Sequence, residues 1–131
     1  RQKVLSDVSH NRAGIGSLAD YLGDLQVTKI HLVTGLSGER APEEVMLPLE
    51  NLVASVYAVP VCFGPGVPTA RIAAWAAGVA LPCKEYLSAE EGLAAAVAAC
   101  GNEAPVVICG SLYLVAELSK KFKAGDLPFI H

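Results

Sequence analysis

The stretch Asp7-Val8-Ser9-His10-Asn11 groups three side chains that can do chemistry directly after an apolar run. It offers a carboxylate acceptor, an ionisable imidazole and an amide within five residues. At the end of a strand, such groups can reach ribose hydroxyls or phosphate oxygens. The residues also suit a simpler role, in which Asp7 and Asn11 cap the next helix and His10 is an ordinary surface side chain.

A second stretch, residues 106–118, reads VVICGSLYLVAEL and changes character at Gly110-Ser111. Before this pair the sequence is an apolar β-type run, and after it the sequence suits a helix. A glycine at a strand end allows close backbone approach, and a serine can cap the new helix. Ligands of open parallel sheets bind beyond the carboxyl ends of the strands. The stretch therefore predicts a strand-turn-helix aimed at a binding edge, although a tight turn without a ligand fits it equally well.

The stretch GIGSLA, from Gly14 to Ala19, matches the Gly-x-Gly-x-x-Gly/Ala fingerprint of dinucleotide-binding folds. Its context is poor, because the glycines should follow the strand directly and six residues separate Asp7 from Gly14. The second predicted strand also ends in Thr34-Gly35, where a ribose-binding acid is needed. The sequence contains no Gly-x-x-x-x-Gly-Lys-Ser/Thr loop. We therefore predict neither an NAD site nor a P-loop in this chain.

β-Branched apolar runs alternate with Ala- and Leu-rich segments of helical period along the whole chain. The predicted strands are Lys3–Val8, Lys29–Thr34, Ser55–Val61, Val79–Cys83 and Pro105–Cys109. The predicted helices are Arg12–Leu22, Pro42–Val53, Pro68–Ala77, Ala89–Cys100 and Ser111–Lys123. Strands joined by helical crossovers pair in parallel with right-handed connections. The sequence thus predicts one α/β domain, a Rossmann-like open, mainly parallel sheet with helices on both faces.

Several helix ends carry their own signals. Ser88 and Glu91 form a capping box before the fourth predicted helix. Pro48 does not suit a helix interior, so we expect a kink there or two short helices. The prolines at first-turn positions are Pro42 and Pro68. The glycines expected to end helices are Gly23, Gly78 and Gly101.

Composition excludes several classes of function. The 131 residues fit a single domain, and 53% hydrophobic with 18% charged residues indicates a packed core. A net charge of -3 and scattered basic residues give no surface for DNA or RNA, so no nucleic-acid partner is expected. The longest apolar windows, such as Ile72 to Leu81, are too short to span a bilayer, and no signal peptide is evident. We expect no membrane association and a cytoplasmic location.

The cysteines form no metal-binding or disulfide pattern. They are Cys62, Cys83, Cys100 and Cys109. They are far apart, form no Cys-x-x-Cys pair and have no His at zinc-ligand spacing. We expect small, buried apolar residues.

Taken together, the two polar motifs resemble a known family. VLSDVSHNRAG, followed by a helix, is similar to the opening of the C-terminal domain of folylpolyglutamate synthase and dihydrofolate synthase, in the Mur ligase superfamily. Members typically carry Asp-Gly/Val-Ala-His-Asn-Pro here. VVICGSLYLVAEL resembles the closing Gly-Ser-Leu/Phe-Tyr/His-x-Val signature of that family, and VTGLSGERAPEEVMLPL resembles a strand, a Leu-Ser/Ala-Asp-Lys-Asp type loop and a helix. The resemblance runs in order over nearly the whole chain.

This resemblance implies part of an ATP-dependent ligase that activates a folate carboxylate as an acyl phosphate, which the amino group of glutamate attacks. It implies ATP and magnesium as cofactors, with the P-loop and metal-binding residues in an N-terminal ATPase domain that is absent here. By matching positions, Asp7 becomes a ribose contact and His10 a phosphate-side contact, while Asn11 shapes the turn. Ser111 and Arg71 become substrate-binding candidates near the amino acid. The expected small-molecule partners are ATP, glutamate, and folate or dihydropteroate.

Two departures from the family pattern concern the first motif, because Arg12 stands where a proline usually follows the asparagine and Ser9 replaces alanine. The segment expected before the first strand is also missing, which suggests an excised domain covering residues 1–131, inactive alone and monomeric. Two alternatives remain open. One is the C-terminal domain of another Mur-type amide ligase, and the other is a non-catalytic Rossmann-like binding module.

Overall fold

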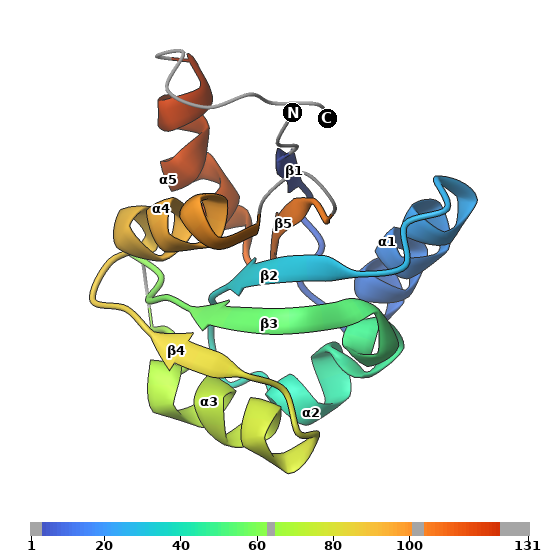
Figure 1. Ribbon diagram of the computed structural model, residues 1–131. Coiled ribbons are helices and arrows are strands. Elements are labelled where there is room, and N and C mark those ends of the chain that lie inside the picture. The colour runs from blue at the N-terminus through green and yellow to red at the C-terminus, as the bar shows by residue number, and fades with distance from the viewer. Residues whose placement is uncertain (1–3, 63–64, 101–103, 124–131) are drawn as a thin grey trace.

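The computed structural model of the chain describes residues 4–62, 65–100 and 104–123 (Figure 1). Its strands are β1 (Val4–Ser6), β2 (Ile30–Thr34), β3 (Val53–Ala58), β4 (Cys83–Glu85) and β5 (Val106–Cys109). Its helices are α1 (Arg12–Asp24), α2 (Pro42–Val45), the 3-10 helix η1 (Leu47–Leu52), α3 (Thr69–Gly78), α4 (Ala89–Cys100) and α5 (Leu112–Lys123). The predicted alternation of strands and helices is therefore confirmed.

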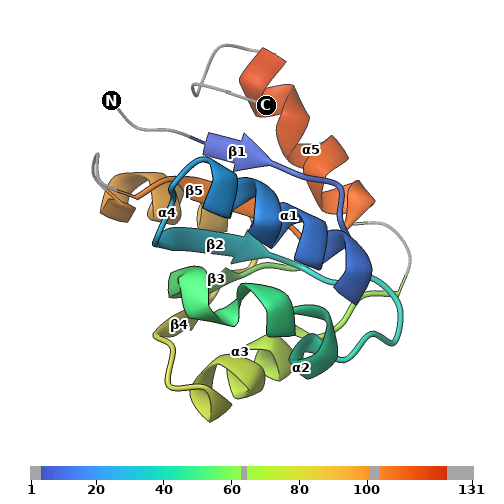
Figure 2. The same cartoon turned by 90° about the vertical axis from the view of Figure 1, so that its right-hand side faces the viewer.

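The strands form one sheet in the order β1-β5-β2-β3-β4, and every neighbouring pair is parallel. The last strand lies between the first and second, since Val106 is in register with both Val4 and His31. Figure 2 shows β1, β5 and β2 side by side beneath α1. The predicted Rossmann-like open parallel sheet is confirmed.

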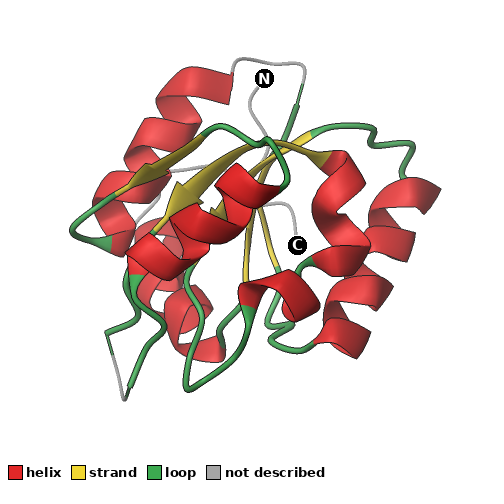
Figure 3. Cartoon of the chain, turned by 90° about the horizontal axis from the view of Figure 1, so that it is seen from below, coloured by secondary structure: helices red, strands yellow, loops and turns green. Residues whose placement is uncertain are grey.

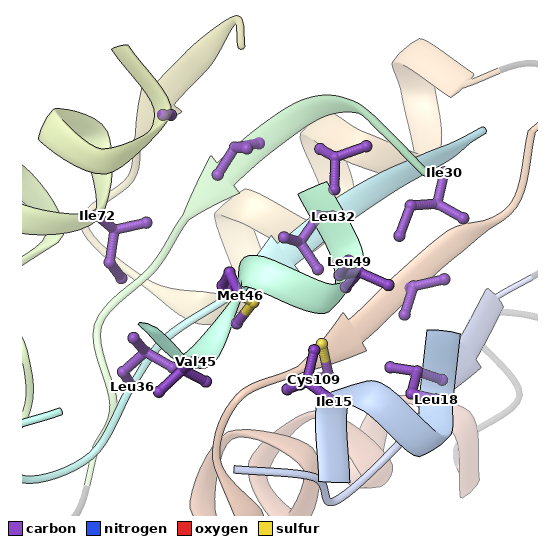
Figure 4. Packing of buried hydrophobic residues seen from close by; sticks show 14 of the residues in the cluster. Ile15, Leu18, Ile30, Leu32, Leu36, Val45, Met46, Leu49, Ile72 and Cys109 are labelled. Atoms are coloured by element: carbon purple, nitrogen blue, oxygen red, sulfur yellow. The ribbon is translucent and has the colours of Figure 1, made fainter. Parts of the chain in front are cut away.

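Helices cover both faces of the sheet (Figure 3). The helices α1, α2, η1 and α3 bury their apolar side chains against one face, where Ile15, Met46 and Ile72 belong to the same core cluster as Leu32 (Figure 4). The helices α4 and α5 cover the other face through Leu93, Leu114 and others. Strands buried on both sides need apolar residues at successive positions, which explains the continuous apolar runs of β2 and β5. No helix in the described ranges is long and apolar enough to cross a bilayer.

The segment from Pro42 to Val53 forms two short helices, which meet just before Pro48. The helix α2 ends at Val45, and η1 begins at Leu47 with Pro48 in its first turn. Because proline lacks an N–H donor, it is tolerated at a helix start and not in a helix interior. The expectation of two short helices is confirmed.

The predicted strand Val79–Cys83 is mostly wrong. Its first residues close α3, because Val79 N–H donates to the Trp75 carbonyl at 3.2 Å and Leu81 N–H to the Ala76 carbonyl at 2.8 Å. The strand β4 begins only at Cys83. The third strand also lies earlier than Ser55–Val61, since β3 spans Val53–Ala58. Short apolar runs fit a strand or the end of a helix equally well, so periodicity alone does not place them.

The helix caps are only partly as predicted. Ser88 Oγ accepts from the Glu91 N–H at 3.1 Å, which confirms the serine cap of α4. The predictions for Gly23 and Gly78 are wrong, because both lie inside helices and the positive φ angles belong to Gln26 (61°) and Ala80 (59°). Gly101 lies outside the described residues.

Exchanging residues at the end of α3 should stabilise the domain. Ala80 adopts a left-handed φ that glycine adopts without strain, so we expect Ala80→Gly to raise the free energy of unfolding by about 0.5 to 1 kcal/mol. As a control, a methyl group at Gly78 would meet no other atom within 4 Å, so Gly78→Ala should stabilise by a similar amount through helix propensity. Urea denaturation measures the free energy of unfolding of both variants. A value for Ala80→Gly below that of the unsubstituted chain would contradict the expectation.

The cysteines differ in exposure. Cys109 is buried, Cys83 is half-buried and Cys62 is exposed. The prediction of buried cysteines is therefore wrong for Cys62, which lies in the loop after β3, and the side chain of Cys100 lies outside the description. Burial raises the pKa of the Cys83 and Cys109 thiols, which keeps them protonated and poorly nucleophilic at neutral pH.

Candidate functional site

The two sequence motifs lie side by side at the carboxyl edge of the sheet. The loop after β1 and the turn after β5 touch directly, because Gly110 N–H donates to the Ser9 carbonyl at 2.9 Å. Asp7 N–H donates to the Ile108 carbonyl at 2.9 Å, which extends the pairing of β1 and β5 to the first motif. Residues about 100 positions apart in sequence therefore share one edge.

Gly110 explains why the last strand breaks where it does. Its φ is +112°, which side chains rarely adopt, and an added Cβ would lie 2.5 Å from Thr34 Oγ1 and 2.9 Å from the Gly35 carbonyl oxygen. Thr34 is buried and its hydroxyl donates to the Cys109 carbonyl at 2.8 Å, so it has little freedom to move away. Only glycine fits both the conformation and the space at this turn.

Asp7 holds the first turn together and keeps one carboxylate oxygen open. Its Oδ1 accepts from the Ser9 N–H at 2.8 Å and also from the Ser9 hydroxyl. Both bonds end on the same oxygen, so Oδ2 has no hydrogen bond within the part of the chain that the structure describes. An oxygen that is fixed in place and has acceptor capacity left is suited to receive a hydroxyl donor.

His10 and Asn11 follow with different functions. The His10 side chain is exposed, and its Nδ1 lies 3.3 Å from the Val8 carbonyl, so the ring proton belongs on Nδ1 and Nε2 keeps its own bonding capacity. Asn11 caps α1, since its Oδ1 accepts from the Gly14 N–H at 2.8 Å. The glycines of GIGSLA therefore lie inside α1, which leaves no dinucleotide turn there.

A cavity of about 260 Å³ opens beside the start of α1. Its lining consists of Asn11, Arg12, Glu39, Arg40, Ala41, Glu44 and Val45. The lining carries two arginines, Arg12 and Arg40, and two glutamates, Glu39 and Glu44, so its formal charges balance beside the N-terminus of α1. We did not predict Arg40, although it lies in the loop GLSGER after β2, at the same edge.

Ser111 lies deeper in the edge than a surface binding residue. It is 1% exposed, its Oγ is 2.7 Å from Ser37 Oγ, and it accepts from the Tyr113 N–H at 3.2 Å. It therefore caps α5 and connects that helix to the loop after β2. That loop is tied in turn to the loop after β3, because Gly38 N–H donates to the Pro65 carbonyl at 2.8 Å.

Arg71 lies in the first turn of α3 and pairs with Glu43 of α2. Its two terminal nitrogens donate to the two carboxylate oxygens, and Nη2 to Oε1 measures 2.6 Å. The hydrogen bond from Arg71 lowers the pKa of the Glu43 carboxyl. Both side chains are exposed, so the pair can open without leaving a buried charge. The structure does not bring Arg71 into contact with Asp7, His10 or Ser111.

The donor set of this edge suits organic anions and hydroxyls and not a metal ion. Among the described residues, no group of three or more His, Cys, Asp or Glu side chains could hold a metal. The edge instead combines the open Asp7 Oδ2, the exposed His10 imidazole and two arginines beside a helix N-terminus. Carboxylate, imidazole and guanidinium groups can form hydrogen bonds with hydroxyls and with anionic oxygens.

Fold and edge together define a Rossmann-like α/β domain, and solved structures share its architecture. No protein-family model and no curated protein matches this chain. FolC from E. coli in complex with ADP superimposes with a TM-score of 0.76 at 21% identity, over 92% of this chain and 28% of that one. The bifunctional folylpolyglutamate synthase/dihydrofolate synthase of Yersinia pestis, complexed with AMPPNP and Mn, gives a TM-score of 0.78 at 20% identity, over 89% and 28%.

A more distant similarity points the same way. The folylpolyglutamate synthetase of Helicobacter pylori matches with a TM-score of 0.66 at 14% identity, over 90% of this chain and 28% of that one. The chain thus spans a little over a quarter of the length of these synthases. At such identities the comparison establishes a shared fold, and what those proteins bind belongs to them.

Proposed function

We propose that this chain is the C-terminal domain of an ATP-dependent ligase that adds glutamate to folate, as folylpolyglutamate synthase, dihydrofolate synthase or both. The observation that carries the proposal is the meeting of the Asp7-to-Asn11 and Gly110-Ser111 motifs at one sheet edge. The two motifs resemble this family in sequence, and solved synthases share the fold. The motif resemblance and the shared fold are separate observations, and both support the proposal.

In this proposal the domain closes over ATP that a separate N-terminal domain binds. Asp7 Oδ2 accepts from a ribose hydroxyl, His10 contacts the phosphates, and Asn11 holds the turn that presents them. The proposal assigns magnesium to the N-terminal domain. In such a reaction the folate carboxylate would attack the γ-phosphate of ATP and release ADP, and the glutamate amine would then displace phosphate from the acyl phosphate to form the amide.

The two residues proposed for glutamate binding, Arg71 and Ser111, contribute less directly than the nucleotide contacts. Arg71 can reach an acidic substrate only by exchanging its Glu43 partner, which exposure makes inexpensive. Ser111 is buried, so its proposed contribution runs through its hydrogen bond with Ser37 and the position of the loop after β2. Folate or dihydropteroate and glutamate complete the proposed ligands, in a monomeric cytoplasmic enzyme.

Exposed apolar side chains beside the first motif favour a covering domain. Val8 is 53% exposed, Leu112 56% and Tyr113 47%, and they belong to the two segments joined by the Gly110–Ser9 hydrogen bond. Apolar groups gathered beside polar ligand-binding groups are typical of a surface that another domain covers. Such a surface favours this proposal over a stand-alone binding module.

A comparison of the isolated chain with the longer polypeptide that contains it tests the proposal. We expect the 131-residue chain to release no phosphate from ATP, because it lacks a P-loop and a metal cluster in its described part. The longer polypeptide should release phosphate only when folate or dihydropteroate and glutamate are both present. Activity with a cell-wall precursor in place of folate would support another Mur-type ligase, and substrate-dependent phosphate release by the isolated chain would refute the proposal.

A further inference from the structure

A second cavity of about 260 Å³ lies on the α4 side of the sheet and shares no residue with the carboxyl-edge site. The lining residues that matter for its chemistry are Ser55, Tyr57, Lys84, Tyr86, Ala95 and Ala99. The cavity exists because α4 packs on β2, β3 and β5, so that β4 continues beyond the helix (Figure 1). The helix residues on that side are alanines, which leave the space unfilled.

Aromatic rings give this cavity a flat, apolar wall. The rings of Tyr57 and Tyr86 stack with centroids 6.1 Å apart and planes 23° apart. Tyr57 also makes an edge-on contact with His31, at 6.4 Å between centroids. Stacked aromatic rings beside small alanine side chains favour a planar ring over a branched aliphatic group.

The polar groups of the cavity set the charge of a ligand. Ser55 Oγ lies 2.6 Å from His31 Nδ1, and burial lowers the pKa of His31, so this pair is neutral at pH 7. Lys84 is in register with Tyr57 and carries the only charge among the lining residues. In the described ranges its ammonium group forms no ion pair or hydrogen bond. An exposed cation without a partner, above an aromatic wall, is suited to an anionic group.

We propose that this cavity binds a small planar aromatic anion, an arene carboxylate, with its ring against Tyr57 and Tyr86 and its carboxylate toward Lys84. The volume lies just below the range of ordinary ligand pockets, which limits the ligand to one ring or two fused rings. The site is independent of the ligase proposal, because no residue proposed to contact nucleotide or glutamate lines it.

The test is a nuclear magnetic resonance titration of the isotope-labelled 131-residue chain with 2-naphthoate. We expect saturable shifts at the amides of Tyr86, Ala95 and Ala99, with a Kd on the order of 1 mM for so small a ligand. Ala99→Leu fills the cavity and should weaken binding about tenfold or more. The matched control is Ala98→Leu, also an exposed alanine of α4 but outside the lining, which should leave the Kd unchanged.

A second comparison isolates the charge. Lys84→Met should weaken 2-naphthoate about fivefold and leave the neutral analogue 2-naphthamide unaffected. The proposal is overturned if 2-naphthoate gives no saturable shift, or if Ala98→Leu weakens binding as much as Ala99→Leu. Equal affinity for 2-naphthoate and 2-naphthamide in the unsubstituted chain would overturn the claim that the cavity prefers an anion. Concentration-dependent shifts of the same amides without ligand would assign the cavity to a second copy of the chain and also overturn it.

Discussion

Alanine at Asp7 or at His10 is expected to lower the turnover of the proposed full-length ligase by about one to three orders of magnitude, which corresponds to about 1.4 to 4 kcal/mol of transition-state stabilisation. Asp7 presents an open carboxylate oxygen, and His10 an exposed imidazole, at the edge where this type of sheet binds ligands. If the proposal is right, removing either group weakens the positioning of the nucleotide, and positioning is most of the catalysis in phosphoryl transfer. The measurement is ATP-dependent glutamate addition at saturating substrate.

Two further variants separate binding from folding at this turn. Asp7→Asn keeps an acceptor for the Ser9 N–H, so it should preserve the turn while losing the charge of the carboxylate. Asp20→Ala, which removes an exposed carboxylate from the helix α1 that follows this turn, should leave turnover unchanged. Loss of the turn in Asp7→Ala should cost about 1 kcal/mol of stability, so a small melting shift is compatible with the proposal. Normal turnover and unchanged apparent ATP affinity in both alanine variants would reduce the motif to a structural turn.

Gly110→Ala is expected to destabilise the isolated domain by about 3 kcal/mol or more, a large part of the total stability of an ordinary domain. The backbone of the new alanine must keep a positive φ. Its methyl group would lie 2.5 Å from Thr34 Oγ1 and 2.9 Å from the Gly35 carbonyl oxygen. Relief by moving Thr34 would break its buried hydrogen bond to the Cys109 carbonyl. The melting temperature should fall by about 10 °C, since each kcal/mol is worth several degrees in a domain of this size.

Gly23→Ala is the matched control for this substitution. Gly23 is exposed inside α1, and a Cβ there would meet no other atom within 4 Å. The control should stabilise the domain by about 0.4 to 1 kcal/mol through helix propensity and a less flexible unfolded chain. A loss below about 1 kcal/mol for Gly110→Ala would show that the turn relaxes, and would contradict the requirement for glycine.

Local sequence determined most of the secondary structure. Apolar runs of β-branched residues became β2 and β5, and Ser88 and Pro48 marked helix boundaries correctly because capping and proline geometry act over a few residues. The failures were also local. The run Val79 to Leu81 closes α3 and is not a strand, and left-handed residues Gln26 and Ala80 replaced the expected glycine caps. There tertiary packing overrides weak preferences of single residues.

The candidate site was foreseen residue by residue but not as an arrangement. The sequence indicated the polar turn at Asp7 and the Gly-Ser break at Gly110, since each is a local pattern next to a strand end. It did not reveal Arg40 in the first cavity, the Glu43 partner of Arg71 or the burial of Ser111. Those depend on which loops meet, and loops meet according to the strand order.

The strand order itself was decided only by the tertiary structure. All-parallel strands buried on both faces carry the same kind of apolar sequence, so nothing in that sequence specifies which strand neighbours which. Placing β5 between β1 and β2 depends on long-range packing of α1 on one face and of α4 and α5 on the other. That insertion brings Gly110 to Ser9 and Ser111 to Ser37, and so turns separate motifs into one edge.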